Sequence, residues 1–247
     1  MMNQDIDSTR RNLLGAAAAT ALMAASTANA KTRLEKGVRP SLPAFESQSS
    51  LKPLGFDPAK LTGLSEHLIR SHWENNYGGS VKALATVKKQ LSEALANKDT
   101  PAFIYNDLKR EHLLRTGSVV FHEYYFDNLG GSGKAGANER KTIADSFGSF
   151  DTWETEFRRI GAGLGGGSGW VILGFNAHIN QFENYWLADH AHGPAATMPI
   201  LVMDMYEHSY QMDFGAAAAK YIDAFFQNIQ WDEVASRIET VQRVYRA

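Results

Sequence analysis

The sequence predicts an α+β fold in which helices come first and a small sheet follows. Apolar residues recur every three or four positions between residues 58 and 129, which is typical of amphipathic helices. Three short runs rich in aromatic and β-branched residues, 170–173, 181–187 and 198–203, are then typical of strands. A glycine-rich stretch at 130–133 separates the two patterns, so we expect a helical region followed by an α/β region.

The helical region is expected to form an antiparallel pair of helices. An aspartate and a proline at 57–58 provide a cap and a first turn, and the spacing predicts a helix over 58–77. Gly78-Gly79 is expected to interrupt it, with the helical period resuming over 81–97. A second long helix is predicted from Pro101 to the glycines at 130, 131 and 133, because Gly is disfavoured inside helices.

The α/β region is expected to combine the three strands with four shorter helices. We expect the strands to be separated by residues 174–176 and by a loop that holds Gly193-Pro194. The helices are predicted over 138–146, 150–161, 216–226 and 232–244. The predicted organisation of the chain is an export signal (1–30), an extended lead-in (31–57), a helical hairpin domain (58–132) and an α/β domain (133–247).

The first thirty residues have the features of an export signal. Arg10-Arg11 precede a weakly apolar, alanine-rich run, and Ala30 closes a small-residue site at which we predict cleavage. The paired arginines resemble a twin-arginine signal, which export machinery reads on folded proteins; the alternative is an ordinary secretory signal. The apolar run is shorter than the ~20 residues that span a bilayer. We therefore expect an exported, periplasmic protein with no stable membrane span.

Composition restricts the chemistry. The formal net charge is −2 and the pI is about 6.4, so the chain has no large basic surplus of the kind that binds nucleic acid. It contains no cysteine, which excludes disulfides, thiolate metal sites and cysteine nucleophiles. Any metal must therefore bind to nitrogen and oxygen ligands.

A group of three histidines and one aspartate indicates such a site. Asp204 and His208 lie four residues apart where a strand gives way to a helix, and His72 and His122 each lie on the apolar side of a predicted helix. Each residue alone is equally consistent with a helix cap or a hydrogen-bonded core histidine. Together they suit iron or manganese, but zinc accepts the same ligands, so ligand type does not establish redox chemistry.

From about Pro43 to the C-terminus the chain resembles the iron/manganese superoxide dismutases. The motifs that carry the resemblance occur in the family's order, and the Asp-x-x-Glu-His string is the most specific of them. They are Phe147-Gly148-Ser149-Phe150, Gly167-Ser168-Gly169-Trp170, Asp204-Met205-Tyr206-Glu207-His208 and Trp231.

The resemblance implies a fold, a reaction and an assembly. It implies a helical hairpin packed on an α/β domain with a three-stranded antiparallel sheet, and a metal between the two. The reaction would convert superoxide to dioxygen and hydrogen peroxide by redox cycling of one bound Fe or Mn ion per subunit. The residues do not decide between the two metals, and we expect Fe by a slight margin. The implied metal ligands are His72, His122, Asp204 and His208, and Glu207 would reach across a homodimer to a ligand histidine of the partner.

The chain departs from the family around the metal. The family has a tyrosine eight residues after the first ligand and often a histidine four after it, where this chain has Ser80 and Asn76. Tyr77 is the nearest phenol. The tyrosine three residues after the last ligand is Gln211 here, and the tryptophan before the glutamate is Tyr206.

His190 is expected to donate to the solvent molecule at the metal, because it aligns with a glutamine of the manganese enzymes that has this role. His192 is the competing candidate in the same loop, and Gly117 and Ser118 leave room for a side chain from that loop. The residues expected around the metal are His190, Tyr77, Asn76, Trp170 and Glu207. The alternatives to dismutation are a metal-binding or structural relative without turnover and a scaffold that holds zinc.

Overall fold

The computed structural model describes residues 42–47 and 50–245. The predicted export signal, its cleavage point after Ala30 and the lead-in before residue 42 lie outside these residues. Among the described helices, none combines the length and the hydropathy needed to cross a bilayer.

A three-stranded antiparallel sheet forms the centre of the fold, as predicted. Its strands are β1 (Trp170–Asn176), β2 (Gln181–Leu187) and β3 (Thr197–Asp204), in the order β2-β1-β3. The central strand β1 is buried on both faces, which explains why its sequence is a continuous apolar run rather than an alternating one.

Strand β1 is longer than the sequence predicted. Residues 174–176, expected to separate two strands, pair with both neighbours, and the turn follows at 177–180. The register with β3 shifts between Leu173 and Gly174, which marks a bulge. A side chain at Gly174 would lie 2.4 Å from Thr197 Cγ2, so the glycine reflects close packing and not the end of the strand.

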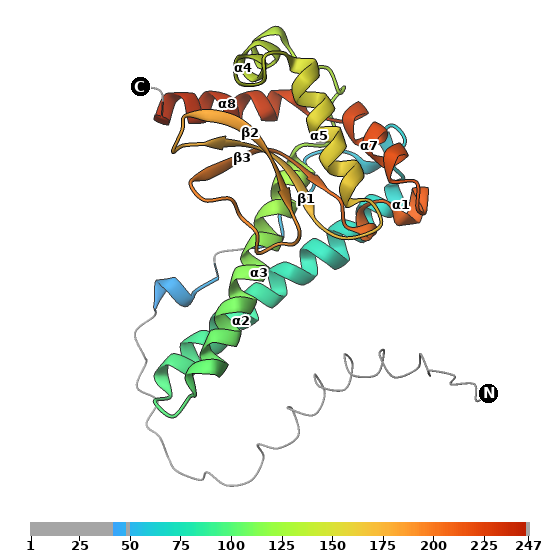
Figure 1. The fold of residues 1–247 in the computed structure, drawn as a ribbon. Helices are drawn as coiled ribbons and strands as arrows, with labels where there is room; N and C mark the ends of the chain where they lie inside the picture. Colours follow the sequence, from blue (N-terminus) through green and yellow to red (C-terminus); the bar gives the residue numbers. More distant parts are fainter. Residues whose placement is uncertain (1–41, 48–49, 246–247) are drawn as a thin grey trace, which may run out of the picture. The chain divides into compact units, whose positions relative to one another are not determined.

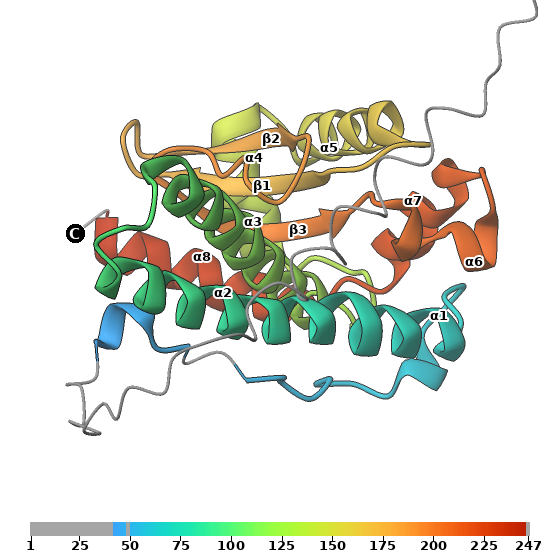
Figure 2. The same ribbon diagram turned by 90° about the horizontal axis from the view of Figure 1, so that it is seen from below.

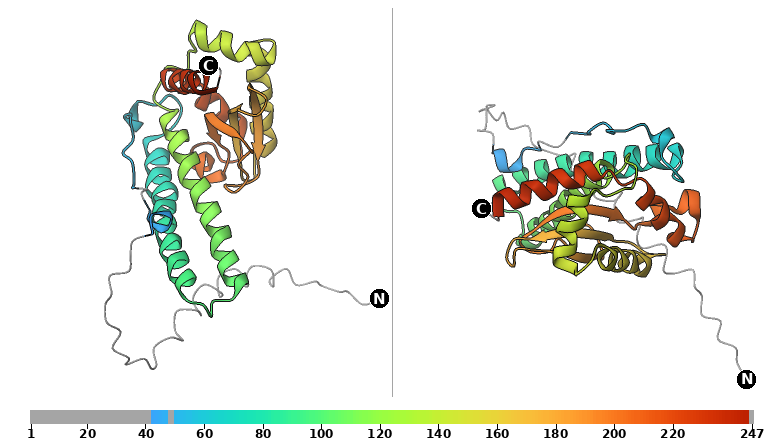
Figure 3. Two further views of the ribbon diagram at one scale, coloured as in Figure 1. Left: turned by 90° about the vertical axis from the view of Figure 1, so that its left-hand side faces the viewer. Right: turned by 90° about the horizontal axis from the view of Figure 1, so that it is seen from above.

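Helices lie on both faces of this sheet (Figures 1, 2 and 3). Helices α4 (Ala137–Phe147) and α5 (Phe150–Leu164) cover one face, and α3 (Ala102–Asp127) and α8 (Trp231–Tyr245) pack on the other. Helix α2 (Gly78–Ala96) runs antiparallel beside α3, and this pair projects beyond the sheet (Figure 3, left). The predicted helical pair and the α+β class are confirmed.

The start of the first long helix differs from the prediction. Asp57 caps only a 3₁₀ turn, η4 (Pro58–Lys60), and Gly63 then takes a positive φ of 75°, which favours glycine. Helix α1 (Glu66–Ser71) begins after Ser65, whose Oγ accepts a hydrogen bond from the backbone N–H of Leu68.

The two adjacent glycines do not interrupt this helix, which corrects a second prediction. A π-helical turn, η5 (His72–Tyr77), continues α1, and α2 begins at Gly78 without a break. Glycine costs a helix only about 1 kcal/mol per residue, which packing can offset. A side chain at Gly78 would contact Leu51 at 3.6 Å, so the lead-in packs directly against the glycine.

Shorter elements complete the described chain, and one hydrophobic core unites it. The remaining elements are η3 (Pro43–Phe45), η6 (Glu207–Ser209), α6 (Gln211–Phe214) and α7 (Ala218–Gln227). Buried residues from the helical pair and from the sheet belong to the same cluster, within one compact unit over Leu42–Ala247. The boundary at 132/133 falls in the connection between α3 and α4, and the domain division stays a prediction.

Candidate metal centre

Four side chains from four elements meet where the helical pair contacts the sheet. His72 opens the π-helical turn η5, His122 lies in α3, Asp204 ends β3, and His208 lies in the turn η6. One potential ligand atom from each residue lies within 4.8 Å of the other three. We call these four residues the metal cluster.

Asp204 is the centre of the metal cluster. Its Oδ2 lies 3.2 Å from Nε2 of both His72 and His208, and 3.7 Å from Nε2 of His122. Its other oxygen, Oδ1, accepts a hydrogen bond from the backbone N–H of Tyr206 at 2.8 Å. The carboxylate is therefore oriented by the backbone and presents one oxygen to three imidazoles.

The backbone of Asp204 is held as firmly as its side chain. Its carbonyl accepts hydrogen bonds from Ser209 Oγ at 2.9 Å and from the hydroxyl of Tyr221 at 2.6 Å. Tyr221 is fully buried on α7, so the C-terminal helices help to fix the end of β3.

His122 shows which of its nitrogens is available to a metal. Its Nδ1 lies 2.7 Å from the carbonyl oxygen of Ser118, one turn earlier in α3. A carbonyl only accepts hydrogen bonds, so Nδ1 carries the proton and Nε2 keeps a free lone pair. Nε2 is buried without a hydrogen-bond partner in the described part of the chain. A metal-ligating imidazole requires this arrangement, with the proton on one nitrogen held by an acceptor and a free lone pair on the other.

Unpartnered nitrogens show that a cation fits between these residues. Nε2 of His72 is likewise buried without a hydrogen bond to any described residue, although it is close to Asp204. Leaving buried polar atoms unpaired costs free energy unless another group satisfies them. Ligand bonds of about 2.1 Å to one ion would place ligand atoms no more than about 4 Å apart, near the observed separations. The donor set suits a first-row transition metal.

Burial sets the charges of the metal cluster. Burial lowers the pKa of His122 to about 3, and the imidazole of His72 adds to the effect. Burial also lowers the pKa of His72. For Asp204, burial alone would raise the pKa, but the imidazoles of His208 and His72 outweigh it and hold the pKa well below its ordinary value. Neutral imidazoles and an ionised carboxylate are the forms that bind metals.

A cavity of about 410 Å³ opens above the metal cluster, and His122 and His208 form part of its floor. Side chains from α3, the π-helical turn, α2, the loop after β2 and the turn after β3 line its sides. We call five of them the cavity wall: Asn76, Ser80, Arg115, His190 and Tyr206.

His190 lies in the cavity wall, and its expected role as a donor to the solvent molecule at the metal stays a prediction. Its Nδ1 accepts a hydrogen bond from Nε1 of Trp170 at 3.0 Å, and its ring stacks on Tyr206 with centroids 4.6 Å apart. An added methyl group at Gly117 would lie 1.7 Å from the carbonyl oxygen of His190, so α3 has space for this loop only with glycine there. His192 is exposed and binds Asp189 instead.

The other four predicted residues lie in different places relative to the cavity. Asn76 lines the cavity, and Trp170 is fully buried with its ring nearly perpendicular to that of His122. Tyr77 is not among the residues that line the cavity, but its buried ring stacks on His122 with centroids 6.2 Å apart; its hydroxyl donates a hydrogen bond to Glu123 and accepts one from the backbone N–H of Lys52. Glu207 is exposed in η6.

Gln211 and Arg115 differ in their relation to the cavity. Gln211 is exposed at the start of α6 and is absent from the cavity lining. Arg115 lines the cavity, but sequence reasoning missed it. The signal was its position seven residues before His122, because residues two helical turns apart share one face.

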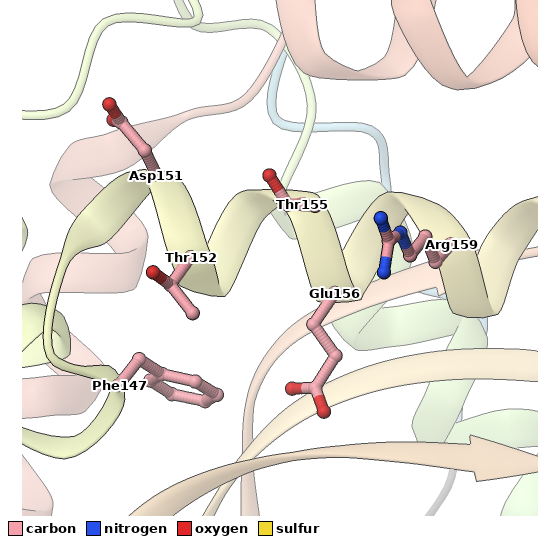
Figure 4. A pocket seen from close by; sticks show the side chains of 6 residues that line it. All are labelled: Phe147, Asp151, Thr152, Thr155, Glu156 and Arg159. Atoms are coloured by element: carbon pink, nitrogen blue, oxygen red, sulfur yellow. The ribbon is translucent and has the colours of Figure 1, made fainter.

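A second hollow, about 490 Å³, lies away from the metal cluster on α5 (Figure 4). Its side chains stand along the helix and point in different directions rather than toward one point. Glu156 is already bound to Asn184 by a hydrogen bond of 2.9 Å. This hollow therefore has none of the convergent polar groups that mark a binding site.

Comparisons with known proteins agree with this geometry. Residues 135–237 match the family model of the iron/manganese superoxide dismutases, C-terminal domain. The chain is 50% identical over 193 residues to an iron superoxide dismutase of Cupriavidus metallidurans, covering 78% of this chain and 98% of the relative. It is 31% identical over 199 residues to an iron superoxide dismutase of Aquifex aeolicus (77% and 91%). A manganese superoxide dismutase of Haloferax volcanii is 29% identical over 205 residues (81% and 99%).

Proposed function

The chain belongs to the iron/manganese superoxide dismutase family, and we propose that it disproportionates superoxide at the metal cluster. Two superoxide ions and two protons give one dioxygen and one hydrogen peroxide. The observation that carries the proposal is the convergence of three histidines and one aspartate beneath an open cavity.

The metal cluster would hold the ion, and one side of the ion would remain open to the cavity. His72, His122 and His208 would bind through Nε2 and Asp204 through Oδ2, because these atoms face one another. A bound iron or manganese ion would supply the one-electron oxidation and reduction that the reaction requires. The hydrogen bonds to Asp204 Oδ1 and from His122 Nδ1 keep these ligands in place.

His190 would hold a proton at the cavity. Trp170 Nε1 can only donate, so it fixes His190 Nδ1 as an acceptor and leaves the proton of the neutral ring on Nε2. Burial lowers the pKa of His190, which favours this neutral form. The ring is clamped by Tyr206 on one side, so the donor is positioned before a substrate arrives.

A hydroxyl pair links the cavity to His122. Ser80 Oγ lies 2.7 Å from Ser118 Oγ, and Ser118 Oγ lies 3.3 Å from His122 Nδ1. Both serines are buried, and Ser80 borders the cavity. The pair would hold solvent protons close to the reaction and orient the imidazole of His122.

Iron is the proposed ion. The relative that is 50% identical is named as an iron enzyme, whereas relatives at about 29% identity are named as manganese enzymes. Elemental analysis and superoxide-dismutase activity, measured on the same natively purified sample, test the ion and the reaction together. We expect one iron per chain and activity, with both lost in His122→Ala. Stoichiometric zinc would contradict the proposal.

A metal-binding relative without turnover is the second candidate, and the position of Tyr77 favours it. The hydroxyl of Tyr77 is engaged outside the cavity, so this phenol is not available to a substrate there. Full iron or manganese occupancy without superoxide consumption would support this candidate and exclude the first.

We also propose that the protein is a homodimer. Glu207 is exposed directly beside His208, whose side chain is 25% exposed, so a partner could cover both. Sedimentation of the native protein should give a mass of two chains, and Glu207→Ala should weaken the dimer. A monomer at micromolar concentration would contradict this arrangement.

Export to the periplasm through the twin-arginine route is proposed from the sequence. Arg10 and Arg11 precede a mild apolar run, and this signal exports proteins that have already folded. Cleavage is proposed after Ala30. Replacing both arginines by lysine should keep the precursor in the cytoplasm, and unaffected export would remove the proposal.

A further inference from the structure

Among the described residues that line the cavity above the metal cluster, Arg115 is the one permanent cation and none is a carboxylate. The chain as a whole carries a net charge of −2, and the proposed substrate is an anion. A general attraction by net charge is therefore absent, and any attraction must come from charges near the cavity.

Carboxylates line a neighbouring cavity, so the positive charge of Arg115 becomes more important for an approaching anion. A neighbouring cavity of about 430 Å³ is lined by Asp107, Glu111 and Asp189, with Arg110 as its cation. An anion that approaches this part of the surface meets carboxylates in one cavity and a cation in the other.

We infer that Arg115 draws the superoxide anion into the cavity and positions it for reaction; this inference rests on the proposed function. Arg115 lies two turns before His122 on the same face of α3, so its charge stands at the entrance above a metal ligand. The residue acts on substrate approach and takes no part in electron or proton transfer.

Glu111 holds Arg115 in place. Its Oε1 accepts a hydrogen bond from Arg115 Nε at 2.6 Å, and the arginine side chain is 34% exposed. This bond leaves the two Nη groups of Arg115 without a hydrogen-bond partner among the described residues, so they remain able to bind an anion. The carboxylate of Glu111 also offsets part of the positive charge.

Four variants test the inference by separating charge, position and structure. Arg115→Gln removes the charge, Arg115→Lys keeps it, and Glu111→Gln removes the opposing charge. Arg110→Gln is the matched control, because it removes the same charge from the same helix at the neighbouring cavity. Metal content is measured first, and kcat/KM for superoxide is compared at equal metal content across ionic strengths.

The expected result follows from electrostatic steering, which raises association rates by about 10-fold to 1,000-fold and weakens with salt. Arg115→Gln should lower kcat/KM about 3-fold to 10-fold at low salt. The difference should shrink near 0.15 M, where the Debye length is about 8 Å. Arg115→Lys should recover most of the lost kcat/KM. The kcat/KM of Glu111→Gln should equal or exceed that of the parent protein, and the kcat/KM of Arg110→Gln should stay within about twofold of it.

A second readout does not depend on turnover. The affinity of the metal-loaded protein for azide, followed by calorimetry, should fall several-fold in Arg115→Gln and stay unchanged in Arg110→Gln. If the parent protein does not consume superoxide, the proposed function fails, while the azide titration still decides whether Arg115 attracts anions.

Three outcomes would overturn the inference. Equal losses in Arg115→Gln and Arg110→Gln would assign the effect to net charge. Equal losses in Arg115→Gln and Glu111→Gln, without recovery in Arg115→Lys, would assign it to the ion pair on α3. Unchanged rates and azide affinity in Arg115→Gln would leave Arg115 with no part in anion approach.

Discussion

The metal cluster and the cavity wall lie next to each other but are built differently. Three of the four residues in the metal cluster are buried, and each is oriented by a backbone group or by core packing. Most of the cavity wall is partly exposed, and its side chains are held mainly by one another and by neighbouring side chains. The comparison teaches that ligand geometry depends on the core, whereas access to the metal depends on loops and helix surfaces that can change independently.

The largest expected effect breaks the metal cluster itself. Asp204→Asn keeps an acceptor for the Tyr206 N–H but replaces Oδ2 by an amide group, which cannot ligate. We expect metal affinity to fall by more than about tenfold, the scale seen even for loss of groups that only support ligands, so the purified variant should contain less metal. Elemental analysis measures it, with Asp223→Asn, an exposed carboxylate on α7, as control. Normal occupancy in Asp204→Asn would refute the proposed ligand set.

Replacement of Gly117, at the junction of the metal cluster and the cavity wall, should have the next largest effect. Gly117→Ala forces a methyl group against the carbonyl of His190, so overpacking should lower the free energy of unfolding by about 1–3 kcal/mol. Gly163→Ala is the control, because its helical position has free space and should gain up to about 1 kcal/mol. Urea unfolding measures both, and equal behaviour of the two variants would contradict the close approach of the loop.

Substitutions of the two histidines in the loop after β2, His190 and His192, test whether the cavity wall affects turnover without affecting metal binding. His190→Ala removes a donor at the cavity but no ligand, so metal content should persist while turnover falls on the order of 10-fold to 100-fold. His192→Ala changes an exposed side chain bound to Asp189, so its turnover should stay within about twofold of the parent protein's. Turnover at equal metal content distinguishes them; equal losses would show that the loop as a whole matters, and not the His190 ring.

The smallest expected effect concerns the serine pair between α2 and α3. A hydrogen bond between two hydroxyls contributes about 0.5–1.5 kcal/mol, and Ser80 and Ser118 are both buried. A double-mutant cycle with Ser80→Ala, Ser118→Ala and the double variant should give a coupling of that size. Strictly additive losses in unfolding free energy would show that the two hydroxyls do not interact.

Much of the fold was predictable because its elements carry local patterns. The helical period and the capping and glycine signals placed α3, α5 and α8, and the apolar run placed β1. The errors occurred at the start of the first helix, at Gly78-Gly79 and at Gly174, and the two glycine sites share one cause. At both places a local preference of glycine is outweighed by packing partners that are remote in sequence, Leu51 and Thr197.

The candidate site was predictable in part for a similar reason. The sequence by itself determined the identity and order of His72, His122, Asp204 and His208, because ligand chemistry requires these residue types and the motifs retain their order. Only the tertiary structure decided that they converge on one carboxylate oxygen, that the Tyr77 hydroxyl binds Glu123, and that Arg115 stands at the entrance of the cavity. Distances between separate elements depend on how helices pack on the sheet, which residue spacing alone does not specify.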